Sequence, residues 1–293
     1  MTEGQTGMSN DISAASSATH ALVLATERLC DLPGIATQDW CDRAAAAFAL
    51  LAPGPVVASI GELNGDTMRV EAYGVAGARA TPDVVRALAA RYRENASFDW
   101  GAGEPSDWNA RVQTMAIESL DDQDLARSKA AKQWREAGAS GVVVGAARYS
   151  PQDERRVLTV EIGCVGSAAS WFPSILRLSV DAAMRPAMRR ANMAFGAEAI
   201  VPSRMLTSRE QEILDKLTLG LSVRVIAAEL DRSPHTVHDH VKSLHRKLNA
   251  SSRGQLIARA LGHAEAFNST KAVRLESEDD DTESLGTAFD TLQ

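Results

Sequence analysis

The sequence predicts two domains of different class: an α+β domain with a small antiparallel sheet covered by helices, followed by an all-α domain of four helices. Three observations lead to this prediction. The length of 293 residues exceeds one average domain and falls short of three. Two pairs of apolar, β-branched segments are each joined by a short polar turn. Beyond residue 205, apolar residues recur at helical spacing between capping residues.

Composition divides the chain into five segments. Both ends are polar: the first is rich in Ser, Gly and Ala, and the last contains ESEDDDTES. A Pro and a loss of periodicity follow Gly196 and indicate a linker. The predicted segments are a disordered N-terminus at 1–17, the α+β domain at 18–196, a linker at 197–204, the all-α domain at 205–263 and a disordered acidic tail at 264–293.

The α+β domain is predicted to open with two helices, at 18–30 and 38–51. A strand pair at 56–63 and 67–75 follows, because these apolar segments flank Asn64-Gly65-Asp66, a strong hairpin signal. Thr81-Pro82 predicts the N-cap and first residue of a helix that runs to about residue 95.

The second half of this domain repeats the pattern. A loop is predicted at 97–109 and a charged helix at 121–137. Strands at 141–150 and 155–165 then flank a polar turn that contains Pro151. A long helix at 170–195 closes the domain, and Pro186 is expected to kink it. Its apolar series could form a dimer seam or cover the sheet: Leu176, Val180, Ala183, Ala187, Ala191 and Ala194.

This order of elements resembles the GAF and PAS sensory domains, which implies that the first domain senses a signal. It is also similar to the ligand domain of quorum-sensing LuxR regulators. Leu88 and Ser97, however, stand near positions where that family has aromatic residues. Tyr92, Trp100 and Trp108 could line a ligand pocket or could instead pin a long loop.

Charge is distributed unevenly along the chain. The formal charge of −7 argues against a nucleic-acid partner for the chain as a whole. Residues 206–262, however, contain nine Lys and Arg against six Asp and Glu, a net charge of +3. The preceding part has 20 basic against 24 acidic residues, and the following part has two against eight. We therefore expect a polyanion to dock on the all-α domain.

The cysteines and the apolar segments set further limits. Cys30, Cys41 and Cys164 are too few and too widely spaced for a disulfide framework or a CxxC metal site, so reduced thiols are expected. No metal and no cofactor are predicted. The chain opens with no basic region followed by an apolar run, and no segment approaches 18 uninterrupted apolar residues. We therefore expect a cytoplasmic protein with no membrane partner.

The all-α domain begins with two predicted helices. In LTSREQEILDKLTLG, Thr207 and Glu210 form a predicted capping box and Gly220 ends the helix. Ser222 is predicted to cap a short second helix. Its expected buried residues are Val225, Ile226 and Leu230.

Ser233-Pro234 opens a third helix with two distinct faces. Its predicted core face carries Val237, Val241, Leu244 and Leu248 at spacings of four, three and four. The opposite face presents His235, His238, Asp239, Lys242, His245 and Arg246. A capped, amphipathic helix that closely follows a short one is typical of a recognition helix for the DNA major groove. Ser252 and Gln255 predict another capping box and a fourth helix.

These motifs resemble the C-terminal DNA-binding domain of LuxR/FixJ-type regulators. LTSREQEIL matches the family's LTxREREVL, GLSVRVIAAEL its GLSNKEIA, and SPHTVHDHVKSLHRKLNASSR its SxxTVKxHxxxIxxKLxxxxR. The resemblance covers about a fifth of the chain. It implies a helix-turn-helix fold, binding to operator DNA and dimerisation through the fourth helix, at Leu256, Ala260 and Leu261.

The resemblance also implies which residues touch DNA. The family's contacting positions fall on His238, Asp239 and Lys242, with Thr236, Arg246 and Lys247 beside phosphates and Arg224, Ser233 and His235 close by. Two positions depart from the family: His238 replaces the usual Lys, and Val223-Arg224 replaces Asn-Lys. Asp239 would be repelled by phosphates unless it accepts a hydrogen bond, and cytosine N4 is a donor that could supply one.

Other kinds of function fit the sequence less well. His238 and His240 diverge on a helix, which disfavours a metal site. An enzyme is not expected, because GxSxG, Walker and GxGxxG motifs are missing from the first domain. A receiver domain would need alternating strands and helices. A module that tethers the DNA-binding domain to another regulator stays open as an alternative.

The sequence thus predicts a transcription regulator that binds double-stranded DNA. We expect it to act as a homodimer. The first domain is expected to control it in response to a small-molecule or protein signal, and RNA polymerase is a further candidate partner. A quorum-sensing-type, ligand-responsive regulator is a second alternative.

Overall fold

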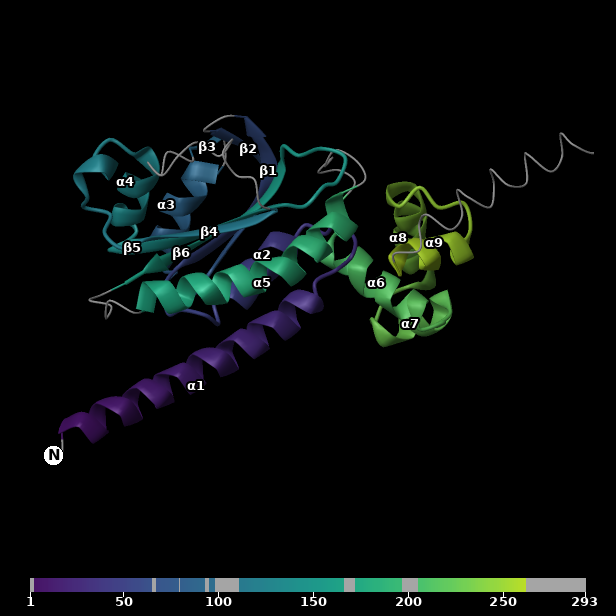
Figure 1. Ribbon diagram of the computed structural model, residues 1–293. Coiled ribbons are helices and arrows are strands. Elements are labelled where there is room, and N and C mark those ends of the chain that lie inside the picture. Colours follow the sequence, from purple (N-terminus) through teal and green to yellow (C-terminus); the bar gives the residue numbers. More distant parts are fainter. Residues whose placement is uncertain are drawn as a thin grey trace, which may run out of the picture. The chain divides into compact units, whose positions relative to one another are not determined.

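The computed structural model describes residues 3–64, 67–78, 80–92, 95–97, 111–165, 172–196 and 205–261. The chain forms two compact units, Met1–Thr207 and Ser208–Gln293, which we call unit 1 and the head. Figure 1 shows their elements. Each unit has its own fold.

A six-stranded antiparallel sheet forms the centre of unit 1, in the order β3-β2-β1-β6-β5-β4. Its strands are β1 (Val56–Asn64), β2 (Thr67–Ala76), β3 (Asn95–Ser97), β4 (Val112–Ile117), β5 (Gly141–Arg148) and β6 (Arg156–Cys164). The two predicted hairpins, β1–β2 and β5–β6, are confirmed and meet through β1 and β6 at the centre. The predicted α+β class with an antiparallel sheet is therefore confirmed.

Helices cover both faces of this sheet. One face is covered by α2 (Trp40–Phe48) and α5 (Phe172–Phe195), and α1 (Glu3–Cys30) packs on these two helices. The other face carries α3 (Pro82–Tyr92) and α4 (Lys129–Glu136), as Figure 1 shows. Two apolar cores result, one on each face. Because helices cover both faces of the sheet, β6 is buried along its whole length and β5 along all but its last residue, so neither strand alternates buried with exposed positions.

Several boundaries differ from the predicted ones. The α1 helix begins at Glu3, although disorder was expected to residue 17. Extending a helix costs far less than starting one, so its packed C-terminal half supports the earlier turns.

The strands β3 and β4 were not predicted. A single charged helix was predicted at 121–137. The structure instead has a 3₁₀ turn, η2 (Gln123–Leu125), followed by α4. The helix α4 begins only after Ser128, because the Ser128 hydroxyl caps it by accepting from Ala131 N.

The long helix α5 contributes to the core on the α2 side of the sheet. Leu176, Val180, Ala183, Ala187 and Ala191 are all 2% exposed or less. Of the two roles considered for this apolar series, the structure therefore supports covering the sheet. The helix continues through Pro186.

The end of unit 1 is fastened to the turn between α1 and α2. Leu206 N donates to Ala36 O and Gln38 N donates to Leu206 O, both at 2.9 Å, which gives a parallel bridge between Thr37 and Leu206. At the end of α5, the Ser150 hydroxyl lies 3.3 Å from Gly196 O. The predicted linker 197–204 and the predicted tail 264–293 lie outside the described residues. In the part of the chain that is described, no helix is apolar and long enough to cross a membrane.

Candidate nucleic-acid interface

The described part of the head, residues 208–261, consists of four short helices with sharply defined ends: α6 (Ser208–Thr218), α7 (Val223–Glu229), α8 (Pro234–Lys247) and α9 (Arg253–Ala260). The predicted caps Ser222, Ser233 and Ser252 each accept a backbone N–H three residues later. Gly220 ends α6 with a φ of 85°, a left-handed conformation that favours glycine.

The apolar faces of these helices meet in a small core. Its fully buried members are Ile213, Leu214, Leu217, Ile226, Ala227, Val237, Leu244 and Leu256. Val225 was expected here but is 44% exposed, because the face of α7 that packs on the core carries Ile226 and Ala227 instead. Leu256, predicted to lie in a dimer interface, belongs to this core and has no exposed surface to offer a partner. Leu261 is 57% exposed and Ala260 is half-buried.

Because Val237 and Leu244 anchor α8 to the core, the opposite side of this helix faces solvent. The predicted DNA-contacting residues lie there: Ser233, His235, Thr236, His238, Asp239, Lys242 and Arg246 are all exposed. Asp239 is paired within the helix. Its Oδ2 lies 3.2 Å from His235 Nδ1 and its Oδ1 lies 3.5 Å from Lys242 Nζ.

Lys247 occupies a different position from the other predicted contacts. Its ammonium donates to Glu210 Oε2 at 2.7 Å, and the Ser243 hydroxyl donates to Glu210 Oε1 at 2.7 Å. The side chain of Lys247 is 13% exposed and that of Glu210 is 5% exposed. This buried ion pair joins α6 to α8, so the charge of Lys247 is already compensated within the head.

Two arginines beside α8 extend its basic surface. Arg224, a predicted contact, is exposed in the first turn of α7. Arg232 is exposed in the turn between α7 and α8 and was not predicted, although its place directly before the Ser233 cap was a usable signal. Arg224, Arg232 and Arg246 form no ion pair with a carboxylate among the described residues. A capped helix flanked by such cations is suited to phosphate binding.

The family comparison agrees with this geometry. Residues 204–260 match the model described as bacterial regulatory proteins of the luxR family. This segment is a LuxR-family helix-turn-helix domain. The predicted resemblance to the LuxR/FixJ-type DNA-binding domain is therefore confirmed for this part of the chain.

Relatives of the LuxR-type domain are transcription regulators. The domain is 42% identical over 57 residues to the probable transcriptional regulatory protein NarL of Mycobacterium tuberculosis, which is 20% of this chain and 26% of that protein. It is 46% identical over 54 residues to the transcriptional regulatory protein UhpA of Escherichia coli, 18% of this chain and 28% of that protein. The chain therefore spans only about a quarter of the length of these relatives.

Solved structures give a weaker likeness over a longer stretch. A structure entitled SdiA in complex with octanoyl-rac-glycerol aligns with a TM-score of 0.34 and 16% identity. The alignment covers 71% of this chain and 81% of that one. A TM-score this low does not assign the fold of unit 1.

In unit 1, the predicted pocket residue Tyr92 is buried in a polar cluster. Glu161 of β6 is fully buried, and its carboxylate accepts from Arg91 Nη1 at 2.6 Å, Tyr92 Oη at 2.8 Å and Trp134 Nε1 at 2.6 Å. Burial raises the pKa of Tyr92 well above its usual value, so its hydroxyl stays protonated and donates. Trp100 and Trp108 lie outside the described residues.

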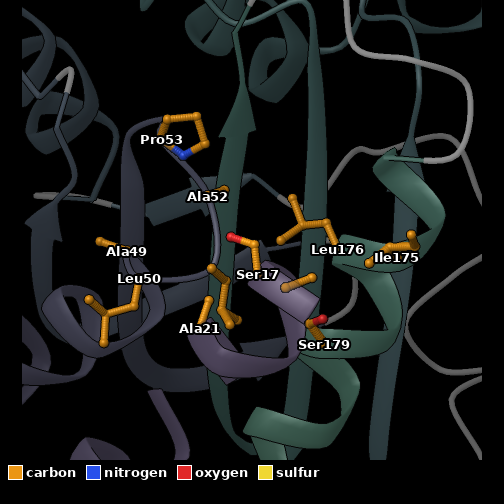
Figure 2. A pocket seen from close by; sticks show the side chains of 11 residues that line it. Ser17, Ala21, Ala49, Leu50, Ala52, Pro53, Ile175, Leu176 and Ser179 are labelled. Atoms are coloured by element: carbon orange, nitrogen blue, oxygen red, sulfur yellow. The ribbon is translucent and has the colours of Figure 1, made fainter. Parts of the chain in front are cut away.

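A groove of about 540 Å³ lies on the other side of the sheet, between α1, the α2–β1 loop and α5. Figure 2 shows its lining, which includes Leu50, Pro53, Ile175 and Leu176. The lining is apolar apart from the hydroxyls of Ser17 and Ser179 and carries no charged side chain. Among the described residues, no group of three His, Cys, Asp or Glu side chains could hold a metal ion.

Proposed function

We propose that this chain is a transcription regulator that binds operator DNA in the cytoplasm as a homodimer, with α8 in the major groove and unit 1 as the controlling part. The observation that carries the proposal is the placement of α8. The helix is held to the core by Val237 and Leu244, it is capped by Ser233, and its polar face is exposed. The relatives of the LuxR-type domain support a regulator rather than an enzyme.

Electrostatics agree with this proposal. Arg246 on α8, Arg232 directly before it and Arg224 on α7 are exposed cations without a carboxylate partner among the described residues. Each phosphate that such a cation neutralises releases condensed counterions, so DNA affinity should fall steeply with salt. A dimer on a two-fold operator doubles these contacts and places two recognition helices one helical turn apart.

The experiment is a binding-site selection on the full-length protein with a random 30-base-pair library, followed by fluorescence anisotropy on the enriched site. We expect an enriched two-fold site. In a variant that lacks a cation contacting one phosphate, the slope of log K against log salt should become shallower by about 0.9. Arg86→Ala, an exposed arginine on α3 of unit 1, is the matched control and should leave the slope unchanged. No enriched site together with salt-insensitive binding would favour the tethering module instead.

A further inference from the structure

The recognition helix carries one acidic residue, Asp239, at the middle of its exposed face. Its side chain is 54% exposed, and those of its neighbours His235 and Lys242 are 87% and 67% exposed. A second acidic residue that contacts α8, Glu210, is by contrast buried against Lys247. Asp239 therefore faces the same solvent, and the same DNA, as the cations around it.

A carboxylate on a DNA-facing surface is repelled by phosphates unless a hydrogen-bond donor meets it. Within the helix, the Lys242 ammonium reduces this repulsion from one turn after Asp239, and His235 Nδ1 lies 3.2 Å from the carboxylate one turn before it. The arrangement presents an acceptor, Asp239, beside a donor, Lys242, with 3.5 Å between the two atoms. These two side chains together complement a base pair whose major-groove edge carries a hydrogen-bond donor next to hydrogen-bond acceptors.

In the major groove, bases offer two hydrogen-bond donors, cytosine N4 and adenine N6. Adenine places the acceptor N7 beside its amino group, and this acceptor repels a carboxylate. Cytosine has no such neighbour, and its paired guanine presents the acceptors O6 and N7 that an ammonium can contact. A cytosine–guanine pair therefore complements Asp239 and Lys242 together.

We propose that Asp239 and Lys242 jointly read one cytosine–guanine pair in each half-site, with Asp239 accepting from cytosine N4 and Lys242 donating to the guanine. This inference rests on the proposed function. It goes beyond that function by naming the base pair and the two side chains that select it.

The test compares site selections for wild type, Asp239→Asn, Asp239→Ala and Lys242→Ala. Wild type should show a fixed cytosine–guanine pair in each half-site, preferred roughly 5- to 150-fold over other pairs. Asp239→Asn should move this position to adenine–thymine, because an amide contacts adenine N6 and N7 together. Asp239→Ala should remove the preference at this position, and Lys242→Ala should reduce it.

Arg246→Ala is the matched control on the same helix. Arg246 is exposed and is not paired with Asp239. Its replacement by Ala is expected to weaken binding to all sites alike without changing the selected sequence. Because Asp239 is exposed, its variants should fold, which circular dichroism would verify. An enriched wild-type site that Asp239→Asn leaves unchanged would overturn this inference alone. Failure of wild type to enrich any site would overturn the proposed function.

Discussion

Glu161 joins three side chains from two helices to the centre of the sheet. It is fully buried, and Arg91, Tyr92 and Trp134 all donate to its carboxylate. A buried ion pair adds little net stability over apolar residues, but removal of one partner leaves the other charge uncompensated. Sequence patterns could not reveal this cluster, because Glu161 and Arg91 lie 70 positions apart.

We expect Glu161→Gln to lower the free energy of unfolding of unit 1 by about 3–5 kcal/mol, because the Arg91 guanidinium loses its carboxylate partner. Urea unfolding followed by tryptophan fluorescence measures this directly, since all five tryptophans precede the head. Glu62→Gln is the control. Glu62 pairs with the exposed Arg69 and Arg155, so its loss should cost at most about 1 kcal/mol. Equal losses in the two variants would contradict the prediction.

We expect buried thiols and phenols to make the stability of unit 1 sensitive to alkali. Burial raises the pKa of Cys164 to about 11 and that of Tyr149 to about 12. It also raises the pKa of Cys41 and of Tyr92 above their usual values. Each folded pKa therefore exceeds its unfolded value, which is about 8.5 for Cys and about 10 for Tyr. The stability that these groups contribute is complete below the unfolded pKa and is lost as the pH rises toward the folded pKa.

The free energy of unfolding of unit 1 should thus fall above about pH 9, with a slope of at most about 1.4 kcal/mol per pH unit for each group. Urea midpoints between pH 7.5 and 11 would show the fall. Cys164→Ala removes one of these titrations and should flatten the curve between pH 9 and 11. A variant curve parallel to that of wild type would refute the assignment to Cys164.

At the scale of elements, segments marked by caps, turn residues or apolar spacing were predicted well, and segments without these signals were missed. Both hairpins and the four helices described in the head were predicted from turn residues, caps and apolar spacing. The strand β3 has three residues and β4 has six half-buried ones, so neither carries an apolar alternation that could be recognised. Their positions follow from pairing with β2 and β5, which is information that local sequence does not contain.

The same limit applies within the candidate interface. The exposed face of α8 followed from its spacing, but the engagement of Lys247 by Glu210 did not, because the two lie 37 positions apart. The burial of Leu256 depends likewise on how α9 packs on α6. Periodicity shows that a helix has an apolar face and does not show which element covers it.

The cap of α8 gives a prediction at this scale. The Ser233 hydroxyl accepts from Thr236 N at 3.1 Å, and its loss should destabilise the helix by about 1 kcal/mol. Hydrogen exchange in peptides from 234–247 should therefore quicken about fivefold in Ser233→Ala. Ser233→Asn is the control, because its side chain also caps and should keep near wild-type protection. Equal exchange in both variants would show that the cap is dispensable.

At the scale of the whole molecule, the proposed dimer predicts different effects for substitutions at two leucines of the head. Leu261 is 57% exposed at the end of α9, and Leu256 is fully buried. Leu261→Asp should reduce cooperative binding to a two-fold site and leave binding to a single half-site unchanged. Leu256→Ala should instead destabilise the head by about 2–5 kcal/mol. Anisotropy titrations on one- and two-half-site duplexes separate the effects, and unchanged cooperativity in Leu261→Asp would exclude α9 as the contact.

The bridge between Thr37 and Leu206 limits the length of chain that can act as a tether between unit 1 and the head. Residues on both sides of 197–204 are held on unit 1, by Ser150 at Gly196 and by the bridge at Leu206. Because both flanking residues are held on unit 1, extra residues in that segment should cost little free energy and add no length between unit 1 and the head. An insertion of eight Gly and Ser residues after residue 200 should therefore leave the half-site spacing unchanged. The same insertion after Leu206, which leaves the predicted Thr207 cap next to α6, should broaden the range of spacings that the dimer accepts, as binding to a series of spaced duplexes would show.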